Sequence, residues 1–386
     1  MQGVLFAWLV TMVLKETPQL VGIAQMALLL PGTVFMLLGG SLADRYGSRR
    51  LLIISQSFSA LAPLFLLSAL LADSLSYTTM LIYAVMMGFA QAFVTPARDG
   101  LLNLVAGKQI QRTVMQAMIM QFGGQILGFS LAGLADSIGA VWVIGMQLVV
   151  LIVGVLAIRK VEVAAPPKVI RQKALLHEIA QSIVEGGRSV FKSTSMRMVM
   201  FQNVAMGAFF MGSYIVTLPI LIREVYAGDS TDLALLNIIN SMGLVSTIFL
   251  LLRFGDIHRQ GRALLIAQGL GCIMLGSPGY VFGFSWLLVF MFGWGMCGGI
   301  AMSMSRTIMQ EKAPPDQRGR IMAFFGFSFM GAGPLGALLS GYLVTRYGPQ
   351  TALMISSAAM FVTIVSVSLL SKLWRLDSRS EAISTD

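Results

Sequence analysis

Long apolar runs alternate with short polar connections along the whole chain. Most of these runs are about 20 residues long, which is the length that a helix needs to cross the hydrocarbon core of a bilayer. The strands of a membrane barrel would be shorter and would alternate between apolar and polar positions, which excludes that architecture. The sequence therefore predicts an all-α polytopic membrane protein. Its twelve transmembrane helices are expected at residues 3–14, 20–43, 51–72, 78–105, 113–138, 140–158, 197–225, 233–254, 263–280, 284–305, 321–344 and 350–372.

The composition also favours a membrane protein. Hydrophobic residues make up 56% of the 386 residues, charged residues make up 11%, and the mean hydropathy is +0.80. A soluble protein of this length could not cover so much apolar surface. The two cysteines, Cys272 and Cys297, fall inside predicted helices, which indicates packing residues and neither a disulfide nor a metal site. Without a nucleophile beside an ordered base or a phosphate-binding loop, we expect no catalytic residue and no enzymatic activity.

The excess of positive charge records how the chain is oriented. The formal net charge is +10, but under this topology almost every Lys and Arg falls on the cytoplasmic side. Only Lys15, Arg223 and Arg346 fall outside, together with six acids. That distribution follows the positive-inside rule and differs from the basic patch of a nucleic-acid-binding protein. We therefore predict a multi-pass protein of the bacterial inner (plasma) membrane that contacts membrane lipids and no nucleic acid.

The chain divides into two halves joined by a polar stretch. We assign residues 1–158 to an N-terminal six-helix bundle and 197–374 to a C-terminal six-helix bundle. Residues 159–196 form a cytoplasmic central loop with an amphipathic helix at 174–191, and 375–386 form a cytoplasmic tail.

The two halves are related in sequence. A shift of 208 residues pairs Arg98 with Arg306 and Gly128 with Gly336, among other matches. A shift of 214 residues relates the 40–50 segment to a copy in the second half that has decayed. Parallel six-helix repeats are the internal symmetry of one large class of secondary transporters.

One polar junction stands out, between the predicted helices at 20–43 and 51–72. It reads Gly-Ser-Leu-Ala-Asp-Arg-Tyr-Gly-Ser-Arg-Arg over residues 40–50. Gly47 allows a tight turn, Asp44 can pair with arginines or a helix N-terminus, and the arginines hold the loop in the cytoplasm. The segment resembles the signature between helices 2 and 3 of the major facilitator superfamily of secondary transporters. The resemblance runs from Trp8 to the last helix and implies two pseudo-symmetric six-helix bundles.

The resemblance also implies a cytoplasmic gate that closes and releases while the two bundles rock about a central cavity. Asp44 would be costly to bury alone, and relatives suggest that it pairs with the helix start at 320–321 or with Arg98. The candidate gate and signature residues are Gly40, Asp44, Arg45, Gly47, Arg49, Arg50, Arg98, Asp99, Arg306, Arg318 and Arg320.

Uncharged polar groups within the spans are the candidate substrate-binding groups. An amide that faced lipid would be unfavourable, so these side chains are expected to line a wet cavity or to join helices by hydrogen bonds, and both alternatives stay open. The candidate cavity residues are Gln25, Gln91, Gln121, Gln125, Asn203, Tyr214, Asn237 and Asn240. The residues expected to allow close helix packing are Gly124, Gly128, Pro334 and Gly336.

No ionisable residue falls at mid-membrane depth in the predicted spans, although a proton-coupled carrier normally needs a buried titrating group. The run at 3–14 is too short to cross a bilayer, so we expect the chain to begin partway through helix 1, which is truncated. Three possibilities stay open. The coupling acid precedes residue 1, or an interface acid such as Asp99 or Asp136 serves, or coupling is absent.

Further motifs resemble the drug and siderophore exporter branch, which contains drug–proton antiporters. They are Trp8-Leu-Val, Pro96-Ala-Arg98 and the Pro-x-x-Arg-Gly-Arg run at 315–320. The resemblance implies a monomeric carrier that exports amphipathic small molecules by proton antiport, with the proton gradient as its energy source and no cofactor. The alternatives are a lysophospholipid transporter, since lipid carriers resemble this branch, and a non-transporting membrane sensor or scaffold on the same fold.

Overall fold

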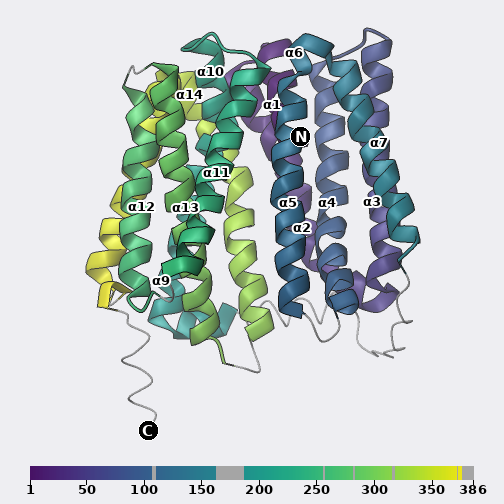
Figure 1. Cartoon of the computed structure of the whole chain (residues 1–386). Helices are drawn as coiled ribbons and strands as arrows, with labels where there is room; N and C mark the ends of the chain where they lie inside the picture. The colour runs from purple at the N-terminus through teal and green to yellow at the C-terminus, as the bar shows by residue number, and fades with distance from the viewer. Residues whose placement is uncertain are drawn as a thin grey trace. The chain divides into compact units, whose positions relative to one another are not determined.

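The computed structural model describes residues 1–106, 110–161, 187–254, 257–280, 283–314, 318–371 and 373–375. Every regular element in these residues is a helix (Figure 1). The chain forms two compact units, Met1–Gln181 with Gly228–Ala234, and Ser182–Ala227 with Leu235–Asp386.

The first unit is built from helices that follow one another through short turns. They are α1 (Gln2–Trp8), η1 (Leu9–Val13), α2 (Pro18–Tyr46), α3 (Ser48–Leu71), α4 (Tyr77–Ala106), α5 (Ile110–Gly133), α6 (Ala135–Ile138) and α7 (Ala140–Arg159). The first turn of α11 (Ser230–Phe254) also belongs to this unit.

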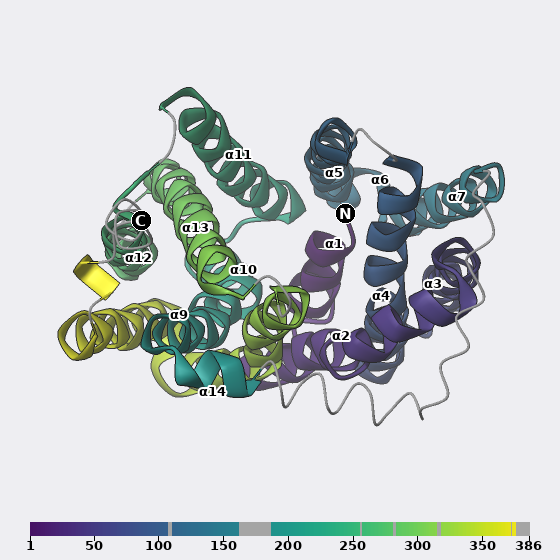
Figure 2. The ribbon, with the colours of Figure 1, turned by 90° about the horizontal axis from the view of Figure 1, so that it is seen from below.

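Glycines let α2 and α4 approach closely. A Cβ atom at Gly39 would overlap the carbonyl oxygen of Ala92 and lie 2.9 Å from Cγ of Pro96. A Cβ at Gly88 would overlap the carbonyl oxygen of Leu28. Backbones that pack without side chains between them gain van der Waals contact, which is the main attraction between helices inside a membrane. Helix α3 packs on the other side of α4 and on α7, as the end-on view shows (Figure 2).

The second unit begins with one long, irregular helical segment. Its elements are α9 (Thr194–Ala205), η2 (Met206–Met211), η3 (Ser213–Thr217), α10 (Leu218–Glu224), the rest of α11, α12 (Gln260–Gly276), η4 (Ser277–Gly279), α13 (Phe284–Lys312), α14 (Arg318–Leu370) and η5 (Leu373–Arg375). Element α14 contains two helices joined at Gly348, whose φ of 80° lies in the left-handed region that favours glycine.

Close backbone contacts also hold the second unit together. On α14, a Cβ at Gly336 would lie 2.6 Å from the carbonyl oxygen of Gly207 and 2.5 Å from that of Ala208. Between α11 and α13, a Cβ at Gly243 would overlap the carbonyl oxygen of Phe292. Each of these positions excludes any larger residue unless a helix moves.

The first span of each half is π-helical over part of its length. Element η1 contains Val10-Thr11, and η3 contains Val216-Thr217 at a shift of 206 residues. The hydroxyl-bearing residues Thr11 and Thr217 are both fully buried. Because single π-turns leave the ordinary backbone ladder and are frequent at functional sites, this shared irregularity marks the two segments as equivalent in the repeat.

The helices fall on the segments that hydropathy predicts. Eight of the described helices are long and apolar enough on their own to cross a membrane, with α14 counted once. The prediction of twelve spans is consistent with these helices. Element α14 contains two of the predicted spans, and shorter or interrupted helices correspond to the remaining predicted spans. The structure differs from the prediction in detail. The predicted span at 113–138 breaks at Leu134, and the one at 263–280 shortens to α12 followed by a 3₁₀ turn.

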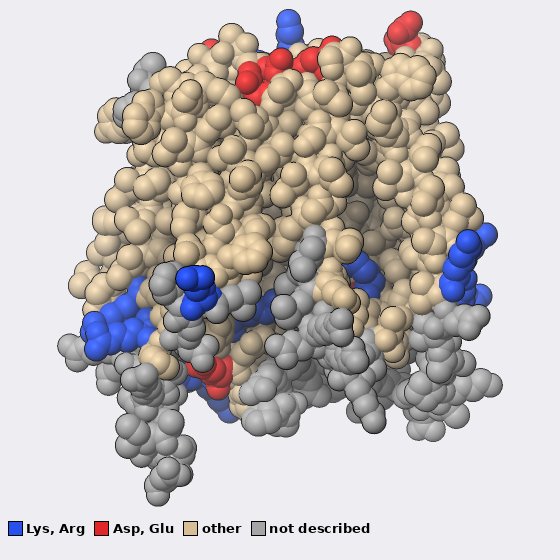
Figure 3. All heavy atoms as spheres, viewed as in Figure 1, with Lys and Arg blue, Asp and Glu red and all other residues tan. Residues whose placement is uncertain are grey.

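Two predicted segments lie outside the described residues. They are most of the central-loop helix at 174–191, of which only residues 187–191 are described and helical, and nearly all of the tail at 375–386. Charged side chains gather at the helix ends (Figure 3). Most of the visible Lys and Arg lie at the lower end in that view and most of the visible Asp and Glu at the upper end, as the positive-inside pattern requires.

Candidate functional site

The signature turn of the first unit is shaped by glycine and packs on a small core. Gly47 ends α2 and begins α3 with φ of 87° and ψ of 129°, a sparsely populated conformation that costs a non-glycine residue about 1–3 kcal/mol. Directly beneath the turn, a buried cluster joins three helices. Its members are Ala43 from α2, Leu52 from α3, and Ala97 and Leu101 from α4.

An arginine of the signature fixes the end of a distant helix. Nη2 of Arg49, in the first turn of α3, donates a hydrogen bond of 2.5 Å to the carbonyl oxygen of Arg159, the last residue of α7. The last carbonyls of a helix lack partners within the helix and carry its negative dipole end, so a guanidinium there is favourable. The signature arginine thereby joins the start of α3 to the end of α7.

The second unit contains a matching contact. Nε of Arg262, in the first turn of α12, donates to the carbonyl oxygen of Trp374 at 3.2 Å, and its guanidinium carbon lies 5.7 Å from the centre of the Trp374 ring. Trp374 belongs to η5, the turn that follows the last helix. At the shift of 214 residues Arg49 aligns with Ala263, so Arg262, one position earlier, makes a similar contact without being the repeat equivalent of Arg49.

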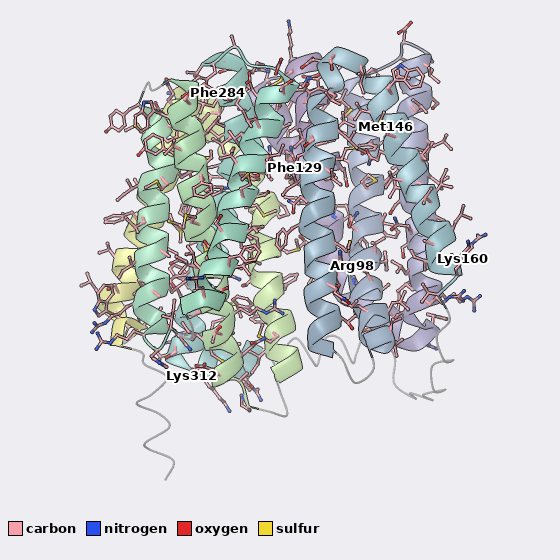
Figure 4. All side chains as sticks on the ribbon, in the orientation of Figure 1. Arg98, Phe129, Met146, Lys160, Phe284 and Lys312 are labelled. Atoms are coloured by element: carbon pink, nitrogen blue, oxygen red, sulfur yellow. The ribbon has the colours of Figure 1, made fainter. Side chains whose placement is uncertain are left out.

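The predicted gate residues are only partly described. Arg98 pairs with its own neighbour Asp99 at 3.0 Å, with half or more of each side chain exposed. Figure 4 shows Arg98 on the lower part of α4 and Lys160 at the lower end of α7. Arg45 is exposed and lies 5.8 Å from the centre of the Tyr46 ring. Arg50 and Arg306 are also exposed.

The side chains of Asp44, Arg318 and Arg320 lie outside the described part of the structure. The pairing of Asp44 with Arg98 or with the start of α14 therefore stays a prediction. Gly40, the first signature residue, has no described atom within 4 Å of a Cβ built on it. Its neighbour Gly39 makes the close approach to α4 instead.

The candidate cavity residues of the second unit meet around an aromatic cluster. The hydroxyl of Tyr214, in η3, donates a hydrogen bond of 2.6 Å to Oδ1 of Asn237 on α11. The ring of Trp294, on α13, lies 5.4 Å from that of Tyr214 and 5.9 Å from that of Phe210. Trp294 is half-buried and Asn237 is buried. We call Phe210, Tyr214, Asn237 and Trp294 the aromatic–amide cluster.

The other predicted amides of this unit join helices. Nδ2 of Asn240 donates to the carbonyl oxygen of Met291 at 3.1 Å. Nδ2 of Asn203 donates to the carbonyl oxygen of Phe325 at 3.0 Å and to the hydroxyl of Ser328 at 2.7 Å. These contacts are the interhelical hydrogen bonds that the sequence left as one alternative.

In the first unit the predicted amides do not form a comparable cluster among the described contacts. Gln25 is buried on α2, whereas Gln91, Gln121 and Gln125 are exposed. The polar contact in its interior comes from two residues that the sequence reading missed. Nε2 of Gln147 donates to the hydroxyl of Tyr83 at 3.3 Å, and the Tyr83 ring stacks on Phe6 at 6.1 Å.

The residues expected to allow close helix packing differ in how closely other backbone atoms approach them. A Cβ at Gly128 on α5 would lie 2.7 Å from the nitrogen of Met1, and Gly336 touches the backbone of η2 as described above. Pro334 is buried in α14. At Gly124 no described atom lies within 4 Å of a Cβ built there, so close packing at this position stays a prediction.

The buried polar side chains of the described residues are all uncharged. They are hydroxyl and amide groups, among them Gln202, whose amide is buried and unpartnered, and Gln268, whose Nε2 lies 3.1 Å from the sulfur of Met206. Unpaired amide atoms inside a protein are costly, so the Gln202 amide and Oε1 of Gln268 are available to a polar ligand or to water. The described Asp, Glu, Lys and Arg side chains are half-buried or exposed.

Comparison with known proteins identifies the family. The chain matches the Major Facilitator Superfamily over residues 1–337 and 204–384, and it belongs to that superfamily. It is 25% identical over 373 residues to the multidrug efflux pump Tap of Mycolicibacterium fortuitum, which covers 93% of this chain and 89% of Tap.

Solved transporter structures share the fold. The D-xylose-proton symporter superposes with a TM-score of 0.70 at 14% identity and covers 97% of this chain and 95% of its own. The nucleoside transporter NupG superposes with a TM-score of 0.68 at 16% identity and covers 95% of this chain and 96% of its own. The predicted all-α transporter fold and superfamily are confirmed, and the protein is a multi-pass membrane transporter.

Proposed function

We propose that this carrier exports amphipathic small molecules without a fixed charge from the cytoplasm, as a monomer in a bacterial inner membrane. The observation that carries the proposal is the aromatic–amide cluster. It offers ring faces from Tyr214, Trp294 and Phe210 and one amide from Asn237, and the buried side chains described around it are neutral.

These groups suit a flat apolar molecule with a few polar atoms. Aromatic rings bind such molecules by stacking, while a hydroxyl–amide pair can exchange its internal hydrogen bond for one to the substrate. A buried fixed charge would favour a counter-charged substrate, and none is found among the described buried side chains. The similarity to an efflux pump supports outward transport.

We further propose that proton antiport drives export. Because the described interior holds no acid, the coupling carboxylates would be at the helix ends, where Asp99 and Asp136 lie. The carrier would then need no cofactor, since the proton gradient supplies the free energy.

Dye accumulation in an efflux-deficient bacterium tests the proposal. Cells that express the protein should accumulate less Nile red, a neutral dye, than cells with an empty vector. Tyr214→Phe, Asn237→Ala and Trp294→Phe should each raise accumulation toward the empty-vector level.

Tyr342→Phe and Trp142→Phe are the matched controls, because both residues are exposed and lie outside the cluster. A protein that is inserted in the membrane but leaves Nile red unchanged contradicts the proposal. In that case altered turnover of lysophosphatidylethanolamine would identify a lipid carrier instead. If the protein transports neither Nile red nor this lipid, the remaining alternative is a membrane sensor or scaffold.

A further inference from the structure

Two buried glutamines of the second unit lie beside one methionine. Gln268, on α12, is 2% exposed, and its Nε2 lies 3.1 Å from the sulfur of Met206 in η2. Gln202, on α9, is 1% exposed and comes four residues before Met206. Residues four apart share one face of a helix, so the two glutamines flank Met206, one along its own helical segment and one from α12. We call Gln202, Met206 and Gln268 the glutamine–methionine group.

Three of the four amide atoms in this group have no hydrogen-bond partner among the described residues. They are Oε1 and Nε2 of Gln202 and Oε1 of Gln268. The fourth, Nε2 of Gln268, contacts the methionine sulfur, which is a weak acceptor. A buried polar group that is left unsatisfied costs about 1–3 kcal/mol. The group therefore offers donors and acceptors that a polar ligand can use.

Other amides of the same unit do have partners. Asn203, the residue after Gln202, donates to the carbonyl oxygen of Phe325 and to the hydroxyl of Ser328. Asn240 donates to the carbonyl oxygen of Met291. Where an amide joins two helices, the fold thus supplies a good acceptor for it. The unused atoms of the two glutamines indicate a group that binds there.

The glutamine–methionine group is continuous with the aromatic–amide cluster. Phe210, a member of that cluster, follows Met206 by four residues in η2. A Cβ at Gly271, three residues after Gln268 on α12, would lie 3.5 Å from the Phe210 ring. Each of these two steps covers about one helical turn, or roughly 5 Å. Aromatic rings and unused amide atoms therefore lie within the length of one small molecule.

We propose that Gln202 and Gln268 form a carboxamide-binding subsite that Met206 covers, so that the preferred substrates are flat aromatic molecules with an amide group. An amide presents a carbonyl oxygen next to an N–H, and the two glutamines offer the matching donors and acceptors. Its oxygen is a stronger acceptor than a thioether sulfur, and the flexible methionine side chain can move aside. The inference rests on the transport proposed above, because it names the substrate class of that site.

The melting of the purified protein with two matched compounds tests the subsite. 2-Naphthamide and 2-acetylnaphthalene share their ring system and a carbonyl group, but only the amide carries N–H groups. We expect wild type to bind 2-naphthamide about tenfold more tightly, so that it raises the melting temperature more at equal concentration. Gln202→Leu and Gln268→Leu should each remove this preference. Gln310→Leu, which changes an exposed amide on α13, should keep it.

The melting of the protein without ligand separates a binding role from a structural one. Each leucine removes buried polar atoms that lack partners, so Gln202→Leu and Gln268→Leu should raise the melting temperature by about 2–4 °C. Removal of a glutamine that joins helices, or that holds a structural water, would lower it. Met206→Leu conserves the volume of the cover and should keep the preference for 2-naphthamide.

Equal affinity of wild type for the two compounds would overturn the inference. An unchanged preference in both leucine variants would do the same, and so would a fall in the melting temperature of both without ligand. Because melting requires no transport, a carrier that exports Nile red without distinguishing the two compounds would disprove the subsite alone. A protein that distinguishes them but exports no dye would disprove the efflux proposal alone.

Discussion

The hydroxyl of Tyr214 and the amide oxygen of Asn237 lie 2.6 Å apart and join η3 to α11, and the Tyr214 ring lies 5.4 Å from that of Trp294. The first span of the second half is irregular at this point, since η3 is π-helical. Irregular backbone and a neutral polar pair thus coincide beside an aromatic surface, which is where a carrier needs groups that can rearrange.

The Tyr214–Asn237 pair should show energetic coupling. In a double-mutant cycle, Tyr214→Phe and Asn237→Ala should together destabilise the protein less than the sum of the single changes, because both remove the same bond. We expect a coupling of about 0.5–1.5 kcal/mol, the usual net value of a hydrogen bond. Thermal unfolding in detergent measures it, and additive effects would show that the bond contributes nothing.

Gly39 and Gly40 should respond in opposite ways to alanine. Gly39→Ala forces a Cβ into the carbonyl of Ala92, and overpacking of this kind costs about 1–3 kcal/mol. Gly40→Ala meets open space and gains helix propensity, so its stability should be unchanged or slightly higher. The melting temperature and the membrane expression level of each variant measure the difference between Gly39→Ala and Gly40→Ala. Equal losses in both variants would contradict the packing of α2 on α4.

Each unit should depend on an arginine near the start of one helix that binds a distant backbone carbonyl. Arg49→Gln and Arg262→Gln each remove a guanidinium that binds a backbone carbonyl near the end of a sixth helix. Each should lower the melting temperature by roughly 1–3 °C, which corresponds to about 1 kcal/mol. Arg50→Gln and Arg253→Gln, at exposed positions, are the controls. Indistinguishable melting of all four variants would rule out the contacts as stabilising.

Alanine substitution should have different effects at the glycines of α5 and α14, although these glycines are similarly spaced. Gly336→Ala places a methyl group against the carbonyls of Gly207 and Ala208, so we expect reduced stability and transport. Gly124→Ala faces no described atom and should be tolerated. Parallel measurement of expression and dye export compares them. A severe defect in Gly124→Ala would indicate a packing partner that these contacts do not include.

Hydropathy predicts most of this fold because a bilayer leaves little choice. Backbone groups must bond internally in lipid, so apolar runs of sufficient length become helices. The signature at 40–50 likewise indicates the superfamily. Neither signal reports which face of a helix meets a neighbour, so the close contact of Gly39 with the Ala92 carbonyl could not be predicted from the sequence.

The site is less predictable than the fold. Tyr214 and Asn237 are conspicuous as polar residues in apolar runs, but their pairing depends on tertiary structure. Trp294 gives no signal in a run of apolar residues, and the π-helical turn at Thr217 has no sequence signature. Asp136 stands out only as an interface acid, because its partners Ser230 and Trp8 lie 94 and 128 residues away in the chain.

Everted membrane vesicles give the most direct test of the central claim. Respiration acidifies their lumen, which corresponds to the outside of the cell. The account predicts that the protein drives Nile red into the lumen, that an uncoupler stops this uptake, and that added dye releases part of the proton gradient. Vesicles that contain Tyr342→Phe should behave like wild type and those with Asn237→Ala should not. Uptake that persists after the proton gradient has collapsed would contradict antiport, and vesicles with inserted protein but no uptake would contradict export itself.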